Sequence, residues 1–307
     1  MTGADDPLAP YRRRLLGLAY RMLGSRADAE DIVQDTYLRY RNASCIDNVE
    51  AWLVTTVTHQ CIDRTRGARA RREVYVGSWL PEPVLNEAEL SPETAMELAD
   101  DLSFALLLVL QRLSPAERAA FLLHDVFEVS FAEISAILGK SSEACRQLAV
   151  RARRTVRKNR PVETWSRSHR SGVLAAFGEA LASGDLQRIV SLLKTDAVLI
   201  ADGGGMKLTA LNPVVGADRI ARYFAGVRRK FPVDPERIRW ETASINGALG
   251  MVIFLDGTVD HTMSIEARDD RITSIYIVRN PQKLEWIGKE IVPLRASFQN
   301  CAAENLQ

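Results

Sequence analysis

Two arginine-rich segments carry the side chains best suited to bind a polyanion. The first contains Arg64 and Arg66, and the second extends from Arg146 to Arg160 without an acidic residue. At helical spacing, one face of the second segment presents Glu143, Arg146, Gln147, Val150 and Arg151. Arginine and glutamine can form bidentate hydrogen bonds with guanine and adenine edges, while further arginines neutralise phosphates. Each segment is therefore either a solvated helical face or a nucleic-acid contact.

An acidic face and a tryptophan are further candidates for contact with a partner. Helical spacing turns Asp31, Gln34 and Asp35 to one side, either toward solvent or toward a basic partner. Trp52 could stack on unpaired bases, although a tryptophan on an apolar helix face usually belongs to the core. We therefore favour packing for Trp52 and leave both interpretations of the acidic face open.

A proline-containing segment separates two parts of the chain. Residues 77–98 break the helical pattern, because Pro81 and Pro83 favour an extended backbone. Trp79 is too large and apolar to gain anything from exposure to water, so we expect it to dock on a protein surface. The segment is predicted to be a linker that is bound through its tryptophan.

Short local signals place the helices that carry these residues. Gly24 ends one helix and Ser25 starts the next, whose inward face is predicted to hold Ala29, Ile32, Val33 and Leu38. Ser114 and Ser130 each precede a glutamate by three residues, which is the capping-box pattern. Gly139 then ends a short helix, and the next helix carries the second arginine-rich segment. This order predicts a helix-turn-helix.

The C-terminal part changes from helical to mixed periodicity. Two helices are expected between residues 173 and 193, and a third over 217–231. Strands are predicted at 197–201, 238–245, 251–255, 258–267 and 272–278. Turn pairs such as Asn246-Gly247 and Asp256-Gly257 separate them. The pattern predicts an α+β domain in which a curved sheet wraps a helix, after two all-α domains.

Composition limits the class of protein. A chain of 307 residues with 47% hydrophobic residues should form two or three domains. The four cysteines, Cys45, Cys61, Cys145 and Cys301, lack the paired spacing of a zinc site or disulfide framework. No apolar run reaches about 18 residues. We therefore expect a cytoplasmic protein without a metal, a cofactor or a membrane partner.

Several motifs occur in an order that is typical of one protein family. Residues 29–36 are similar to a polymerase-binding helix, and residues 51–53 with 61–64 are similar to a promoter-opening helix. Residues 113–118 and 131–134 are similar to the fourth conserved region of the same proteins. Together these motifs resemble the group-four, or extracytoplasmic-function, sigma factors of bacterial RNA polymerase. The resemblance implies binding to core RNA polymerase and initiation at specific promoters.

The resemblance also implies roles for single residues. Asp31, Gln34 and Asp35 would bind core polymerase. Promoter DNA would be contacted by Trp52, His59, Arg64, Arg66, Glu143, Arg146, Gln147 and Arg151. Among these, Arg146 and Gln147 would read bases of the −35 element, while Arg153, Arg154 and Arg157 would meet phosphate or solvent. His59 stands where many relatives have asparagine or arginine.

Three further motifs extend the resemblance into the second half of the chain. Residues 79–83, 202–205 and 280–284 resemble signatures of sigma factors with a fused SnoaL-like domain. This implies an NTF2-like cone fold for the C-terminal domain and control of the sigma domains in cis. The regulatory contact is expected to involve Trp79, Pro81, Pro83, Asp202, Gly203, Gly204, Gly205, Asn280 and Pro281.

The expected domains follow from these motifs and breaks. They are a region 2 domain at 7–76, a linker at 77–98, a region 4 helix-turn-helix domain at 99–160, a SnoaL-like regulatory domain at 170–290 and a tail at 291–307.

Two other functions compete with this interpretation. A ligand-responsive helix-turn-helix regulator would leave the first seventy residues unexplained. An enzyme built on the cone fold would draw its acid and base from Asp202, Asp260, His261 and Tyr276. Because Asp260 and His261 are neighbours on a predicted strand, at most one should face the interior, so we expect no enzyme. The C-terminal domain leaves room for a small ligand of unspecified class.

Overall fold

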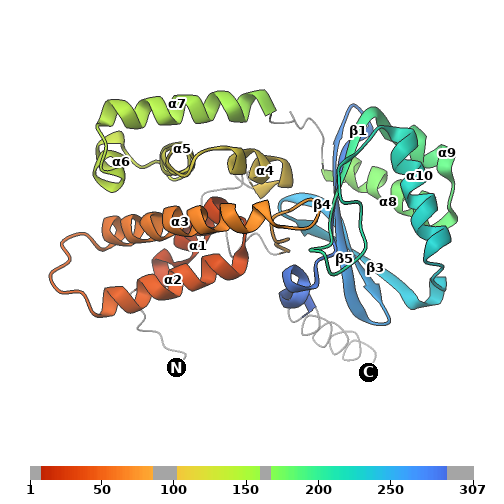
Figure 1. Cartoon of the computed structure of the whole chain (residues 1–307), viewed down its shortest axis with the longest axis horizontal. Helices are drawn as coiled ribbons and strands as arrows, with labels where there is room; N and C mark the ends of the chain where they lie inside the picture. Colours follow the sequence, from red (N-terminus) through yellow and green to blue (C-terminus); the bar gives the residue numbers. More distant parts are fainter. Residues whose placement is uncertain (1–7, 86–101, 160–166, 289–307) are drawn as a thin grey trace, which may run out of the picture. The chain divides into compact units, whose positions relative to one another are not determined.

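The computed structural model of the chain describes residues 8–85, 102–159 and 167–288 (Figure 1). Contacts divide the chain into two compact units. The first comprises Met1–Val74 and Asn86–Pro161, and the second comprises Tyr75–Leu85 and Val162–Gln307. The first part of the expected linker therefore belongs to the same unit as the C-terminal domain.

The first unit begins with three helices. They are α1 (Ala9–Leu23), α2 (Arg26–Arg41) and α3 (Val49–Glu73). Gly24 ends α1 in the left-handed conformation at φ 71°, and the Ser25 side chain accepts a hydrogen bond from the Asp28 backbone N–H at the start of α2. One inward assignment is wrong, because Leu38 is 53% exposed. The buried positions of α2 are Ala29, Ile32, Val33 and Thr36, and Leu38 lies two residues beyond this stripe.

The same unit continues with the predicted helix-turn-helix. Its elements are α4 (Phe104–Arg112), α5 (Pro115–Phe121), a π-helical turn (Leu122–Val126), α6 (Phe131–Leu138) and α7 (Ser142–Asn159). Both predicted capping boxes form, at Ser114 and Ser130, and Gly139 ends α6 at φ 60°. The rest of the expected linker, residues 86–98, lies outside the described residues.

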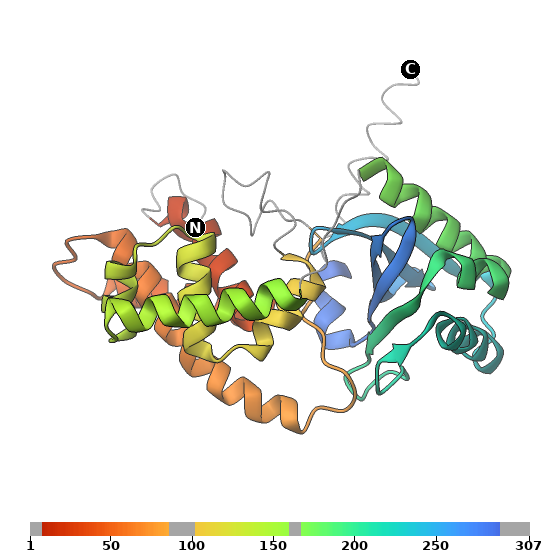
Figure 2. The same ribbon diagram turned by 90° about the horizontal axis from the view of Figure 1, so that it is seen from above.

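The two helical groups of the first unit pack against each other (Figure 2), and buried arginine contacts join them. Arg118 is only 2% exposed, and its guanidinium donates hydrogen bonds to the carbonyl oxygens of Leu110 and Met22. Arg14 Nη2 donates to the Phe127 carbonyl oxygen over 2.8 Å. Because a buried guanidinium requires several acceptors, these contacts specify how α1 packs against the second helical group.

The second unit is an α+β domain. Its helices are α8 (Arg167–Ser183), α9 (Leu186–Leu192) and α10 (Ala217–Lys230), with a 3₁₀ turn at Pro235–Arg237. The strands are β1 (Leu193–Asp202), β2 (Val214–Val215), β3 (Ile238–Ile245), β4 (Ala248–Leu255), β5 (Thr258–Arg268) and β6 (Arg271–Val278). They form one sheet in the order β2-β1-β6-β5-β4-β3, in which β1 and β6 are parallel. Strands β3 to β6 follow the predicted segments closely, whereas β1 begins four residues before its predicted start at 197 and β2 was not predicted.

The core of this domain lies between one face of the sheet and the helices. Phe177 of α8 and Ile220 of α10 are fully buried in a cluster with Leu199 and Ile275 of the sheet. The predicted turns are also present, with positive φ at Asn246 and at other turn residues, including Asp256, Asp269 and Asp270. The α+β architecture is therefore the one expected from the sequence.

Candidate functional sites

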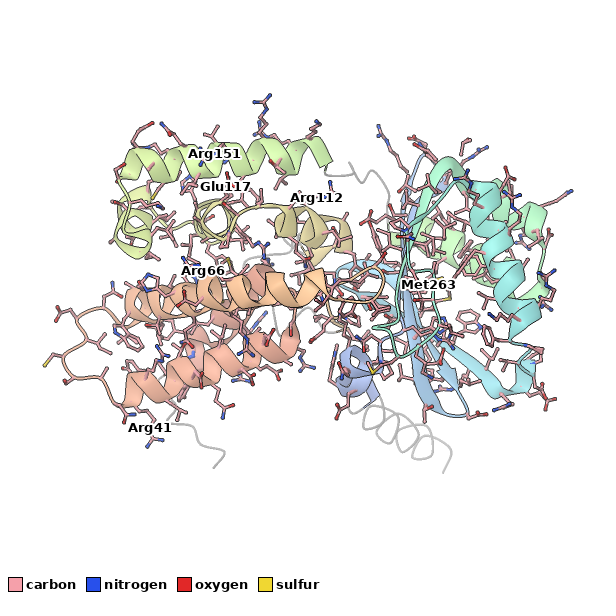
Figure 3. The ribbon with its side chains drawn as sticks, viewed as in Figure 1. Arg41, Arg66, Arg112, Glu117, Arg151 and Met263 are labelled. Carbon is pink, nitrogen blue, oxygen red and sulfur yellow. The ribbon has the colours of Figure 1, made fainter. Side chains whose placement is uncertain are left out.

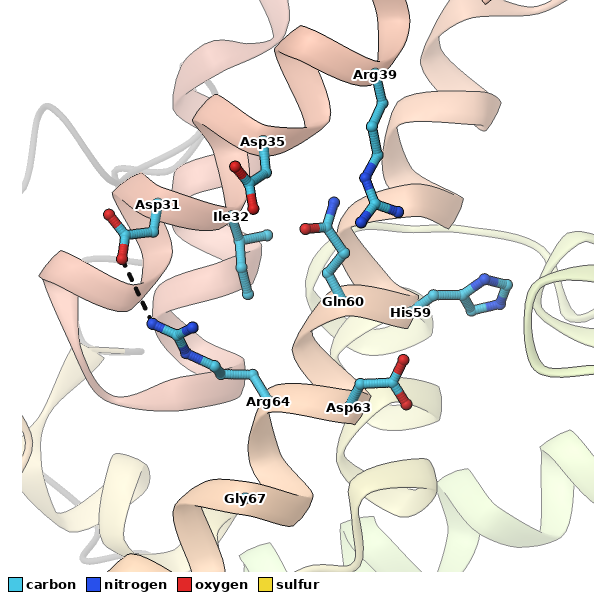
Figure 4. A pocket seen from close by; sticks show the side chains of 9 residues that line it. All are labelled: Asp31, Ile32, Asp35, Arg39, His59, Gln60, Asp63, Arg64 and Gly67. Carbon is cyan, nitrogen blue, oxygen red and sulfur yellow. Dashed lines mark hydrogen bonds and ion pairs between the residues drawn. The ribbon is translucent and has the colours of Figure 1, made fainter.

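The acidic residues of α2 face α3 across a shallow hollow of about 420 Å³ (Figure 4). Asp31 and Asp35 line it from α2, while His59 and Arg64 line it from α3. Arg64 Nε donates a hydrogen bond to Asp28 over 2.9 Å, and its Nη2 lies 3.4 Å from Asp31. The hydrogen bond with Asp28 raises the pKa of Arg64. An expected polymerase contact and an expected DNA contact are thus paired with each other.

The outer face of α2 contains one residue that the sequence analysis missed. Asp31, Gln34 and Asp35 are exposed, as expected. Leu38 lies three residues beyond Asp35 and shares this face, so an apolar side chain stands among polar ones. Single exposed leucines are common on protein surfaces, and this one is accessible to a protein partner. The helical spacing of residues 31, 34, 35 and 38 was the signal in the sequence that Leu38 shares this exposed face.

Along α3, the expected DNA contacts have different surroundings. Trp52 is half-buried, and its ring packs edge-on against Tyr40 at 6.0 Å between centroids, which supports the packing interpretation. His59 is exposed, and its Nε2 contacts the Ile137 carbonyl oxygen of α6. Arg66 is 73% exposed and pairs with Asp63 over 3.1 Å. Of the arginines in this segment, Arg64 and Arg66 alone have described side chains.

Helix α7 has the two faces that its sequence predicts. Cys145, Leu148 and Ala152 are buried, and burial raises the pKa of the Cys145 thiol. The opposite face exposes Glu143, Arg146, Gln147, Val150 and Arg151. Arg146 also stacks over the Phe131 ring, 5.7 Å from its centroid. The exposed face is chemically suited to base contact.

Two arginines of α7 make contacts within the protein. Arg151 Nε donates to Glu117 over 2.9 Å, and both side chains are labelled in Figure 3. Glu117 is also the capping-box residue of α5, so Arg151 ties α7 to that helix start. Arg153, expected to meet phosphate or solvent, instead donates to Asp125 over 2.6 Å and is 30% exposed. These pairs hold α7 in place on α5 and the π-helical turn.

The carboxylate of Asp202 is the centre of a second site, within the second unit. It lies fully buried at the end of β1. Tyr75 Oη donates to Oδ1 over 2.6 Å, and the Leu80 backbone N–H donates to Oδ2 over 2.8 Å. Lys283 Nζ donates to Oδ2 over 2.7 Å. One buried carboxylate therefore holds the start of segment 75–85 on the C-terminal domain.

The tryptophan and prolines of the expected linker are docked at this site. Trp79 lies under the Lys283 ammonium, with Nζ 4.2 Å from the ring centroid, a cation–π contact. Pro81 and Pro83 are buried. Further along, the Val84 backbone N–H donates to Asn246 Oδ1 over 2.9 Å. Segment 75–85 is thus held at Tyr75, Trp79, Leu80 and Val84 by partners on one domain.

The glycine loop after Asp202 is shaped by close approach. The Gly204 backbone has φ 63°, and its N–H donates to Asp202 Oδ1 over 3.0 Å. A Cβ at Gly204 would overlap the Asn280 amide, and one at Gly203 would overlap the Lys207 carbonyl oxygen. Asn280 in turn donates to Tyr75 Oη over 2.9 Å. Glycine is required here because a side chain would displace Asn280.

Sequence reasoning brought together most of this site but missed three residues. Asp202, Asn280 and Trp79 were expected and lie together. Tyr75, Lys283 and Asn246 were not identified as contact residues. Lys283 lies within a motif that was recognised, whereas nothing local distinguishes Tyr75 or Asn246. Burial, followed by the hydrogen bond with Asp202, raises the pKa of Tyr75, so its hydroxyl stays a donor.

The expectation that at most one of Asp260 and His261 faces the interior is wrong. Both line a cavity of about 690 Å³ between the sheet and α8–α10. The β4–β5 pairing shifts between Ile253 and Phe254, so that Ile253 is opposite His261 and Phe254 is opposite Val259. Asp260 is the extra residue of this bulge, and a bulge interrupts the alternation of side chains. His261 Nδ1 lies 2.9 Å from Asp260 Oδ2.

The other two residues considered for an enzyme, Asp202 and Tyr276, do not join Asp260 and His261 in one site. Asp202 serves the linker site. Tyr276 is buried and donates to Glu266 over 3.2 Å, and its pKa is raised by burial and by the nearby carboxylate. Neither residue lines the cavity. In the part of the chain that the structure describes, no cluster of three metal-ligating side chains occurs.

Two protein-family matches cover the two helical groups of the first unit in turn. Residues 8–71 match the family described as Sigma-70 region 2, and residues 103–156 match Sigma-70, region 4. The chain is 36% identical over 282 residues to the ECF RNA polymerase sigma factor SigJ of Mycobacterium tuberculosis, covering 89% of this chain and 90% of the relative. It is 28% identical to the probable ECF RNA polymerase sigma factor SigI of the same species, covering 92% and 94%.

The fold is also similar to that of SigJ. The crystal structure of Mycobacterium tuberculosis SigJ matches with a TM-score of 0.71 and 35% identity, over 89% of this chain and 95% of the other. The match therefore includes the C-terminal α+β domain as well as both helical groups. Among the described residues, no helix is long and apolar enough to cross a membrane.

Proposed function

Because this chain belongs to the extracytoplasmic-function sigma factors of RNA polymerase, we propose that the outer face of α2 binds core polymerase while α3 and α7 contact promoter DNA. A sigma factor of this family binds core polymerase and directs initiation at specific promoters. The region 2 match accounts for the first seventy residues, which a helix-turn-helix regulator would leave without a role.

The separation of charge within the first unit supports this assignment. The outer face of α2 is acidic and includes the exposed Leu38. The outer face of α7 is basic, with Arg146, Arg154 and Arg157 exposed. DNA is a polyanion and needs the basic surface, so the acidic surface is free to meet a protein. Two partners of different chemistry can therefore be bound at once.

Promoter binding also requires a rearrangement of the first unit. His59 stands in the promoter-opening helix, and its ring contacts Ile137 of α6. While His59 Nε2 is held at Ile137, that nitrogen cannot hydrogen-bond to DNA. We therefore expect the two helical groups to separate when DNA binds, and we interpret the described arrangement as a closed state.

We further propose that the C-terminal domain controls this change in cis. Two features support this proposal, namely the short stretch of chain that joins the docked segment to α3 and the hydrogen bonds that hold the segment. Only Val74 separates the end of α3 at Glu73 from Tyr75, whose hydroxyl is bound by Asp202. Docking of segment 75–85 therefore restrains the chain directly behind the promoter-opening helix. The domain acts through binding and not through catalysis, in the cytoplasm where the polymerase works.

Transcription with core polymerase tests the primary assignment. The double variant Asp31→Lys/Asp35→Lys should lose core binding and promoter-specific transcripts while keeping its helical content. Asp196→Lys/Asp218→Lys makes the same change of charge at exposed positions of the C-terminal domain and should retain both activities. Normal core binding by the first variant would exclude α2 as the polymerase-binding helix.

The regulatory assignment has a separate test. We compare the full chain, a chain that ends at Pro161 and the variant Trp79→Ala in transcription and in limited proteolysis of residues 75–85. Removing the Trp79 ring should free the segment and change transcription in the same direction as removing the domain. Identical activity and cleavage in all three would show that the domain is only tethered.

A further inference from the structure

The cavity of the C-terminal domain has the size and lining of a small-molecule site. Its volume of about 690 Å³ is in the range usual for such pockets. Its walls are mainly apolar and include Leu181, Ile189, Phe224, Trp240, Met251 and Met263. Phe231, Ile238 and Trp240 are 40%, 41% and 47% exposed, so they present apolar surface to water that a bound molecule would cover.

The charged groups of the lining are predominantly cationic. Arg228, Arg229 and Arg279 line the cavity, and Asp260 is the one acidic residue among the lining residues. Arg228 and Arg229 are exposed near the end of α10. Arg279 is 27% exposed and lies deeper, beside Asp260 and His261. The balance of charge favours an anion over a neutral or cationic molecule.

The hydrogen bonds around Asp260 leave donors for that anion. Arg279 Nε and Nη2 donate to Asp260 over 3.1 and 3.2 Å, and Nη1 donates to the Leu208 carbonyl oxygen over 3.2 Å. A guanidinium has five N–H groups, so two remain after these three bonds. His261 donates from Nδ1 to Asp260, which in the neutral ring leaves Nε2 as an acceptor, so Arg279 and not His261 supplies the donors.

Asp260 itself is suited to hold these groups and not to exchange protons. Burial alone would raise the pKa of Asp260. Hydrogen bonds from His261 and Arg279 outweigh burial and lower this pKa far below its usual value. A general base works best with a pKa near the operating pH, and Asp260 is far from that condition. Asp260 therefore stays ionised, holds Arg279 and His261 in place and is not itself a general base.

We propose that this cavity binds an apolar carboxylic acid, whose carboxylate meets Arg279 while its hydrocarbon body lies among the aromatic and aliphatic side chains. This site is separate from the docking site of segment 75–85 and does not depend on the sigma-factor assignment. The bound molecule replaces water at the apolar walls and accepts the N–H groups of Arg279 that remain.

Calorimetric titration of the full chain with three probes that each carry a ten-carbon chain tests the proposal. Decanoate should bind, and decanol and decyltrimethylammonium should bind at least about tenfold more weakly, as expected for loss of a charge-assisted hydrogen bond. The variant Asp260→Asn/Arg279→Gln removes the charged pair together, so that neither charge is left buried alone. It should reduce decanoate affinity by about tenfold or more and leave decanol binding unchanged.

Matched controls separate the cavity from general effects. Arg237→Gln/Asp256→Asn neutralises an exposed arginine–aspartate pair of the same domain that does not line the cavity, and it should bind decanoate normally. Ala225→Trp fills the cavity from α10 and should abolish binding, whereas Arg222→Trp, exposed on the same helix, should not.

Three results would overturn the proposal. Equal affinity for decanol and decanoate would show that charge does not select the ligand. Undiminished decanoate binding by Ala225→Trp would place the molecule elsewhere. Absence of binding together with a dimer that Trp240→Glu dissociates in sedimentation would identify the apolar rim as an interface between two copies of the chain.

Discussion

Replacing the buried carboxylate of Asp202 should release segment 75–85 from the C-terminal domain. In Asp202→Asn, Lys283 keeps the Leu80 carbonyl oxygen and the Trp79 ring as partners but loses its counter-charge. Removing one member of a buried ion pair costs about 3–5 kcal/mol while the other stays buried. Undocking exposes Lys283 to water and so limits this cost, which makes local opening the expected response.

The magnitude converts into a measurable rate of exchange. Each 1.4 kcal/mol is tenfold in an equilibrium constant, so amide hydrogens of residues 75–85 should exchange about a hundredfold faster or more. The Leu80 amide is the most direct reporter, because its N–H donates to Asp202 over 2.8 Å. Hydrogen exchange with mass spectrometry of the peptide 75–85 measures the effect in the full chain.

Two further variants serve as controls for this experiment. Asp202→Asn/Lys283→Met removes both charges and should recover part of the protection, because no unpaired ammonium remains. Asp256→Asn breaks an exposed pair and should leave the segment as protected as in the wild type. If Asp202→Asn exchanges at the wild-type rate over residues 75–85, then Asp202 does not hold the segment and the proposed mechanism of control fails.

Three further outcomes follow from the same contacts. Gly204→Ala should lower the melting temperature more than Gly139→Ala, because both positions have positive φ, at a cost of about 1–2 kcal/mol each, but only Gly204 would also displace Asn280. Arg146→Ala should cost about 1–3 kcal/mol in promoter binding and relax preference at one base pair, whereas Arg157→Ala should weaken all sequences similarly in the same binding assay. Leu38→Glu should weaken binding to core polymerase in a pull-down without lowering helical content, since Leu38 is already exposed.

Local features of the fold could be predicted because their causes lie within a few residues. Ser114 and Ser130 cap their helices through a glutamate three residues away, and both capping boxes form. The Asn246 turn follows from the tolerance of asparagine for positive φ. Leu38 was misplaced for a local reason as well, because its inward assignment ignored the phase set by Ile32, Val33 and Thr36.

Features that depend on distant partners could not be read from periodicity. The bulge at Asp260 exists only in the pairing of β5 with β4, so strand alternation gave the wrong prediction. The Asp202 site joins Tyr75 and Lys283 from positions 127 and 81 residues away in the chain. Only the resemblance to a family suggested that the linker, glycine and Asn280 motifs act together, and it did not identify Tyr75.

The cavity and the docking site share one short stretch of chain, which gives a physical route between them. Arg279 lines the cavity, and the next residue, Asn280, contacts Tyr75 of the docked segment. The Arg279 backbone N–H also donates to the Asp202 carbonyl oxygen over 2.7 Å. We therefore expect a molecule that fixes the Arg279 side chain to shift the positions of Asp202 and Asn280, which hold segment 75–85. By thermodynamic reciprocity, any change in docking caused by the ligand requires an equal change in ligand affinity when the segment is released. Asp202→Asn should then alter decanoate affinity although it touches no atom of the cavity, whereas an unchanged affinity would mean that the two sites act independently.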